Sequence, residues 1–170
     1  MSSLKKTVSE GKWLMIFDKA DMNDIEVLTE LRAEYIKEDW GEVPTETMAA
    51  IAGALPEYFA GHLNKDVFAF VCRADDTVAG CCLLYVSEMP PNPSFIHGRT
   101  GTVLNVYTQP PFRRKGIAHR LMEMLLSESE KLGLDYVELK ATDEGYGLYK
   151  KLGFEDTVSK YHNMKYIFSK

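Results

Sequence analysis

The sequence Val-Leu-Asn-Val-Tyr-Thr-Gln-Pro-Pro-Phe-Arg-Arg-Lys-Gly-Ile-Ala, residues 103–118, joins an apolar strand to the start of an amphipathic helix through a proline turn. Its last part is basic and contains Gly116. A helix N-terminus exposes unpaired N–H donors and carries about half a positive charge, so it binds anions readily. The sequence therefore predicts an anion site here, which we interpret as the cradle for the pyrophosphate of a cofactor.

The composition is that of an ordinary globular protein: among 170 residues, 45% are hydrophobic and 26% are charged. We expect a single domain over residues 1–170, with residues 1–11 as a flexible leader. The net charge is −5, and the one dense basic run, residues 113–115, is too short to follow a nucleic-acid backbone. Nucleic acid is therefore not an expected partner.

Cysteine spacing and hydropathy argue against metal-binding, redox-active and membrane-spanning classes of protein. Cys72, Cys81 and Cys82 lack the spacing of a metal or redox site, and we expect them to be small buried hydrophobes. No run approaches the roughly 18 apolar residues that span a membrane, and residues 1–12 lack the apolar core of a signal peptide. We expect a cytoplasmic protein with no metal and no membrane contact.

Hydrophobic periodicity predicts alternating strands and helices. A strand–helix–strand crossover over Val103 to Ala141 requires two nearly parallel strands, whereas the other strands can pair antiparallel. The expected strands are 13–17, 66–73, 78–86, 103–108, 134–141, 154–158 and 160–168, and the expected helices are 23–38, 45–55, 57–63, 115–132 and 145–152.

The hexamer Arg113-x-x-Gly116-x-Ala118 is the first motif that carries chemistry. Gly116 lets the backbone approach a phosphate without a Cβ in the way, and the basic residues Arg113, Arg114 and Lys115 add positive charge. Alone the hexamer is a weak signal, because a helix start with solvated basic residues gives the same pattern. Its place between an expected strand and an expected helix strengthens the interpretation.

The second motif is Leu-Tyr-Lys-Lys-Leu-Gly-Phe, residues 148–154, on a short helix after the next strand. The phenol of Tyr149 could donate a proton to a departing thiolate. The alternative is a core tyrosine that packs beside Phe154.

These two motifs, in this order over Gly101 to Phe154, resemble those of the GNAT superfamily of N-acetyltransferases. The resemblance implies an α/β fold, with a mixed, mostly antiparallel central sheet flanked by helices on both faces. It also implies a parallel strand pair that splays apart at the cofactor site.

The resemblance further implies direct transfer of an acetyl group from acetyl-CoA to a primary amine of a small molecule or peptide. Tyr149 matches the family's general acid toward the CoA thiolate. The sequence leaves open whether the chain forms a homodimer. The positions that match the family's cofactor contacts are Val106, Tyr107, Thr108, Arg113, Arg114, Lys115, Gly116, Ile117, Ala118, His119, Thr142 and Tyr149.

Two positions depart from the family pattern. Thr142 stands where many members have an asparagine that contacts the cofactor arm, and its shorter hydroxyl leaves that contact open. Many members also carry an acidic general base on the strand that corresponds to residues 104–108, where this chain has only Asn105 and Tyr107. Deprotonation could go through water, through a residue elsewhere, or need no strong base.

Outside the two motifs, charged side chains offer weaker candidates for the acceptor site. Glu34, Glu38 and Asp39 could receive a cationic amine, although a solvated helix end is the more ordinary interpretation. His97 and Arg99 in the proline-rich loop could contact substrate. The missing carboxylate also supports an alternative function, a non-catalytic acyl-CoA-binding sensor. A nucleotide-phosphate binder is disfavoured because both glycine-rich nucleotide fingerprints are missing.

Overall fold

The computed structural model of this chain describes residues 7–10 and 13–168. The chain divides into two compact units, one ending at Lys140 and the other beginning at Ala141. In the described residues, no helix has both the length and the apolar character needed to cross a membrane.

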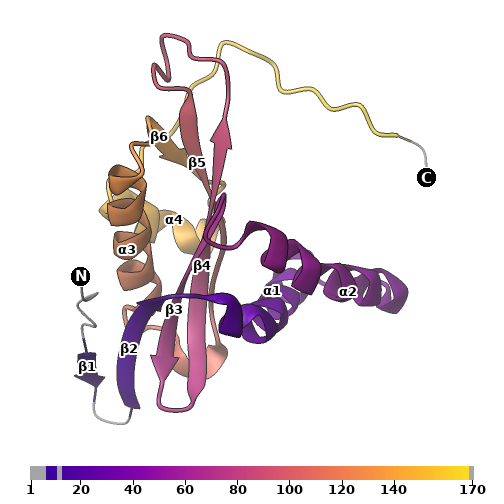
Figure 1. The fold of residues 1–170 in the computed structure, drawn as a ribbon, viewed down its shortest axis with the longest axis vertical. Helices are drawn as coiled ribbons and strands as arrows, with labels where there is room; N and C mark the ends of the chain where they lie inside the picture. Colours follow the sequence, from indigo (N-terminus) through magenta and orange to yellow (C-terminus); the bar gives the residue numbers. More distant parts are fainter. Residues whose placement is uncertain (1–6, 11–12, 169–170) are drawn as a thin grey trace. The chain divides into compact units, whose positions relative to one another are not determined.

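The first unit contains a sheet of six strands in the order β1-β2-β3-β4-β5-β6 (Figure 1). Neighbouring strands are antiparallel except for the parallel pair β5–β6. This pairing confirms the predicted mixed, mostly antiparallel sheet. The strands are β1 Thr7–Glu10, β2 Trp13–Lys19, β3 Val67–Ala74, β4 Thr77–Glu88, β5 Arg99–Thr108 and β6 Tyr136–Glu138.

Helices cover both faces of this sheet, as Figure 1 shows for α1 and α2 on one face and α3 on the other. The helices of the first unit are η1 Met22–Asp24, α1 Ile25–Trp40, α2 Thr45–His62, η2 Pro110–Phe112 and α3 Ile117–Lys131. The second unit contains α4 Asp143–Lys151. The helix pattern was therefore predicted well, except that α2 continues through Pro56 instead of restarting after it.

Two apolar layers hold the helices of the first unit on the sheet. On the α1–α2 side, Leu28 and Phe59 belong to one buried cluster with Val71 of β3 and Cys81 of β4. On the other side, α3 contacts β3, β4 and β5. Its completely buried side chains are Leu121, Met122 and Leu125. The three cysteines are free and buried, as predicted.

Three expected segments differ from the structure. The expected leader contains β1, which pairs antiparallel with β2, and residues 1–6 and 11 lie outside the described residues. The expected strand 134–141 is shortened to β6. The expected terminal strands 154–158 and 160–168 have no regular secondary structure.

The terminal segments show why strand periodicity is not sufficient. A strand needs a neighbour to pair its N–H and C=O groups, and the described residues of the second unit contain α4 but no strand. The large apolar residues of these segments are exposed. They are Val158, Tyr161, Met164, Tyr166, Ile167 and Phe168.

Gly80 gives a test of how closely β4 and β5 must approach. A Cβ at Gly80 would lie 2.7 Å from the backbone oxygen of Tyr107, which is too close for either strand to keep its place. We expect Gly80→Ala to lower the free energy of unfolding by about 1–3 kcal/mol, measured by urea denaturation.

The matched control is Gly53→Ala in α2, where the added Cβ meets nothing within 4 Å. Alanine favours a helix over glycine by up to about 1 kcal/mol, so this variant should be at least as stable as the wild type. Equal stability of the two variants would contradict the close approach.

Candidate functional site

The candidate site begins where β5 separates from its parallel neighbour. β6 pairs with β5 only at Thr100, Gly101 and Thr102. From residue 103 to 108, β5 has no partner on that side among the described residues. The parallel pair is therefore splayed, as predicted, and one backbone edge of β5 is left open along the residues expected to bind a cofactor arm.

A bulge at Asn105 accompanies the separation. The register between β4 and β5 shifts between Cys81 and Leu83, and Asn105 has a left-handed φ of 52°. Asparagine tolerates this conformation better than most residues. Its Oδ1 accepts a hydrogen bond from Nη1 of Arg32 at 3.2 Å, and its Nδ2 lies 3.4 Å from Sγ of Cys81. Asn105 thus fixes the bulge through contacts with α1 and β4.

Tyr107 lies two residues after Asn105 on β5. The side chains of both residues contact α1. The side chain of Tyr107 is buried, and its hydroxyl donates to Oε1 of Glu38 at 3.3 Å. Burial, and then the nearby negative charge of Glu38, raise the pKa of Tyr107 above its ordinary value. The phenol is therefore neutral at physiological pH and holds the end of α1 against β5.

The loop after β5 has the backbone shape of an anion site. Arg114 and Gly116 both have left-handed φ values, 59° and 75°. No side chain caps the N-terminus of α3, and the amides of residues 114–119 have no acceptor among the described residues. A Cβ built on Gly116 would meet nothing within 4 Å, so the space beside it is open. These unpaired N–H groups fit a bound pyrophosphate.

The basic side chains of this loop are held in different ways. Both carboxylate oxygens of Glu38 accept from Nη2 of Arg113 at 2.7 Å, and Nε of Arg113 donates to the Thr108 carbonyl at 2.8 Å. The ammonium of Lys115 lies 5.3 Å from the ring centre of Trp13.

The remaining predicted contacts of the loop differ in exposure. Arg114 is exposed, whereas Ala118 and His119 are half-buried. The side chain of Ile117 is buried in the core, so only its backbone can face a ligand. His119 forms an ion-pair contact with Glu123, one turn further along α3, at 3.7 Å.

The predicted residues Thr142 and Tyr149 belong to the second unit. The hydroxyl of Thr142 accepts from the amide of Gly145 at 3.2 Å and caps α4. The ring of Tyr149 meets Phe154 edge to face, with centroids 5.9 Å apart. The two rings thus make the packing contact that the alternative interpretation of Tyr149 expected, and the acid role stays a prediction.

His97 and Arg99, which were weaker substrate candidates, have structural contacts. Asp135 accepts hydrogen bonds from the backbone amide of His97 at 3.0 Å and lies 2.6 Å from its Nδ1. Nη1 of Arg99 donates to the Leu132 carbonyl at 2.6 Å. These bonds attach the proline-rich loop to the turn between α3 and β6.

Arg32 is the residue of this region that the sequence did not identify as functional. It lies on α1 two turns before Glu38, and its side chain reaches Asn105 in the sheet. The available signal was its position: helical periodicity puts an arginine on the apolar face of α1, where a charge requires a specific partner.

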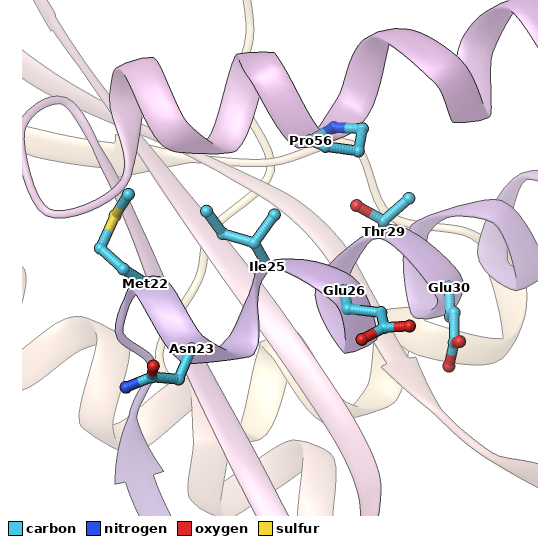
Figure 2. A pocket seen from close by; sticks show the side chains of 7 residues that line it. All are labelled: Met22, Asn23, Ile25, Glu26, Thr29, Glu30 and Pro56. Atoms are coloured by element: carbon cyan, nitrogen blue, oxygen red, sulfur yellow. The ribbon is translucent and has the colours of Figure 1, made fainter.

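Figure 2 shows a separate pocket of about 450 Å³ between the start of α1 and α2. It contains none of the predicted site residues. Thr29 contributes a buried hydroxyl that has no hydrogen-bond partner among the described residues. The lining residues are Met22, Asn23, Ile25, Glu26, Thr29, Glu30 and Pro56.

Comparison with known proteins identifies a matching family. The model of the acetyltransferase (GNAT) family matches residues 25–154. No curated protein gives a significant match.

Solved structures share the fold. A predicted acetyltransferase with acetyl-CoA from Clostridium acetobutylicum is 26% identical, with a TM-score of 0.77 over 89% of this chain and 96% of that chain. A GCN5-related N-acetyltransferase from Ralstonia eutropha is 26% identical, with a TM-score of 0.75 over 88% and 98%. An aminoglycoside N-acetyltransferase in complex with CoA is 17% identical, with a TM-score of 0.65 over 93% and 98%, which shows a common fold.

Substitutions of Asn105 test its role in the bulge. Asn105→Gly removes the side-chain contacts but permits the left-handed conformation, whereas Asn105→Ala also introduces backbone strain. We expect both to be destabilised, and the alanine variant to be less stable than the glycine variant by about 1 kcal/mol in urea unfolding. An alanine variant as stable as the glycine variant would show that the left-handed conformation does not constrain this position.

Proposed function

Because the chain belongs to the acetyltransferase (GNAT) family, we propose that it transfers an acetyl group from acetyl-CoA directly to a primary amine of a small molecule or peptide. The observation that carries this proposal is the juxtaposition of two sets of backbone groups that have no hydrogen-bond partner in the described part of the chain. One is the set of loop amides at residues 114–119, and the other is the open edge of β5. The solved relative from Clostridium acetobutylicum, which contains acetyl-CoA, supports the choice of donor.

The loop is proposed to hold the pyrophosphate through backbone N–H groups and nearby positive charge. The left-handed residues Arg114 and Gly116 turn successive amides toward one side, and the start of α3 adds its partial positive charge. Arg113 and Lys115 supply formal positive charges in the same loop. The side chain of Ile117 is buried, so Ile117 would contact the pyrophosphate only through its backbone N–H.

The open edge of β5 is proposed to bind the pantetheine arm and the thioester. Main-chain groups of Val106, Tyr107 and Thr108 lie along this edge, although the Thr108 carbonyl already accepts from Arg113. A fixed N–H donor near the acetyl oxygen would stabilise the negative charge that develops there when the amine attacks. Positioning the amine against this carbonyl supplies much of the remaining rate acceleration.

Tyr149 is proposed to protonate the leaving thiolate, as its match to the family motif implies. The amine nitrogen bonds to the acetyl carbon, the carbon–sulfur bond breaks, and the phenol proton passes to sulfur while the nitrogen loses its own proton to solvent or a base. Thr142 is proposed to contact the cofactor arm, because its hydroxyl caps α4 by accepting from the amide of Gly145 and can still donate a hydrogen bond.

Substitution of Gly116 tests the pyrophosphate assignment. Gly116→Glu places a carboxylate in the open space beside the loop amides, where it would repel the pyrophosphate. We expect CoA affinity, measured by calorimetry, to fall by about 100-fold or more, which corresponds to losing one or two charge-assisted hydrogen bonds.

Gly116→Ala is the control for this experiment, because it introduces the same left-handed strain without the charge. It should bind CoA much more tightly than Gly116→Glu. If the glutamate variant folds and binds CoA as the wild type does, the pyrophosphate lies elsewhere.

Substitution of Tyr149 tests the acid role. Tyr149→Phe should lower turnover by about 10²–10⁴-fold and leave CoA affinity nearly unchanged, because only the proton donor is removed. Tyr146→Phe on the same helix is the control: its hydroxyl bonds Asp156 at 2.8 Å and has no proposed catalytic role.

Turnover is measured as release of free CoA thiol in the presence of a panel of amines. Unchanged turnover in Tyr149→Phe would remove the acid role. CoA binding without thiol release from any amine would favour the acyl-CoA sensor over the enzyme.

A further inference from the structure

An ion pair connects the loop after β5 to the end of α1. Nη2 of Arg113 lies 2.7 Å from both carboxylate oxygens of Glu38, and the two side chains are 38% and 46% exposed. Nε of the same arginine donates to the Thr108 carbonyl at 2.8 Å. The pair therefore lies at the end of β5, between the proposed phosphate loop and the helix that covers this face of the sheet.

Glu38 also contacts the sheet. Its Oε1, one of the two oxygens that accept from Arg113, also accepts from the hydroxyl of Tyr107 at 3.3 Å, and this second bond connects the carboxylate to β5 independently of the arginine. Arg113 and Glu38 come from different elements: Arg113 belongs to the loop after β5, and Glu38 belongs to α1. Both contact Tyr107, Glu38 through the hydroxyl and Arg113 over the ring at 5.7 Å. Because both side chains are partly exposed, the arginine can change partner by moving its side chain.

A pyrophosphate in the loop would compete with Glu38 for this arginine. Half-exposed ion pairs contribute little to stability, whereas hydrogen bonds between a guanidinium and a phosphate are among the strong charge-assisted kind. The free energy lost when Arg113 leaves the carboxylate is therefore smaller than the free energy gained when it binds a phosphate. The exchange leaves Glu38 beside Tyr107 as a negative charge without its guanidinium partner.

We propose that Glu38 exchanges Arg113 for a cationic group of the acceptor when the donor binds. The inference rests on the proposed function, since it takes residues 113–119 as the pyrophosphate site. It assigns the acceptor to amines that carry a second positive charge besides the nitrogen that is acetylated. Acetyl-CoA then strengthens acceptor binding, because it removes the internal cation that occupies Glu38 in the free protein.

Glu38→Gln tests the first half of the exchange. Glutamine keeps the size and can still accept from Tyr107, but it no longer attracts Arg113 as an ion. We expect the affinity for CoA, measured by calorimetry, to rise about two- to fivefold, which corresponds to the loss of a weak competing pair. The matched control is Glu30→Gln, which removes an equal charge about two turns earlier on α1. Glu30 is exposed and lines the separate pocket of Figure 2, which contains none of the predicted site residues, so its substitution should leave CoA affinity nearly unchanged.

The second half is tested by the binding of 1,4-diaminobutane, with 4-amino-1-butanol as the probe that lacks the second charge. Binding is read as the increase in thermal midpoint, because a ligand of the folded state raises it. In wild type and in Glu30→Gln, saturating CoA should enlarge the increase caused by the diamine. In Glu38→Gln this enlargement should be lost, and the amino alcohol should show none in any variant.

The exchange is overturned if Glu38→Gln and Glu30→Gln bind CoA equally, or if CoA leaves the effect of the diamine unchanged in wild type. Both readouts measure binding and need no turnover. Failure of the proposed function would instead appear as no thiol release from any amine while these binding effects persist. The two failures are therefore distinguishable.

Discussion

The separation of β5 from β6 after Thr102 is the constraint on which the candidate site depends. Backbone hydrogen-bonding groups inside a continuous sheet are already paired and cannot bind anything else. Beyond the end of β6, one edge of β5 has no partner strand among the residues that the structure describes, while β4 pairs with the other edge. A strand paired on one edge keeps its extended shape and still has backbone donors and acceptors available on the other.

The bulge at Asn105 shows how the chain maintains this arrangement. A left-handed residue within a strand is unfavourable unless its surroundings hold it there. Here the side chain of Asn105 contacts Arg32 on α1 and Cys81 on β4, so the helix and the neighbouring strand both fix the bulge. The same helix reaches β5 again through Glu38 and Tyr107. The shape of β5 and the position of α1 therefore depend on each other.

The sequence predicted the local elements around the candidate site. The loop 113–119 was singled out because proline, basic residues and glycine follow one another there, and the structure places it between β5 and α3 with left-handed φ values at Arg114 and Gly116. Contacts between distant segments could not be found in this way. Arg32 and Asn105 are far apart in sequence, and nothing in either neighbourhood specifies the other as a partner. The prediction of strands at 154–158 and 160–168 was wrong for a related reason. Apolar residues in a short segment can suggest a strand, but they do not specify a neighbouring strand to pair with it.

Residues 104–108 of β5 contain no carboxylate, but α1 places one beside this strand. In the sequence, the acidic residues at the end of α1 are far from β5 and have the pattern of a solvated helix end. In the structure, Glu38 of that helix lies within hydrogen-bond distance of Tyr107 on β5. The helix that packs on a strand can thus place a carboxylate at the end of that strand. What the Glu38 carboxylate can bind depends on the cation that pairs with it, and in this structure that cation is Arg113.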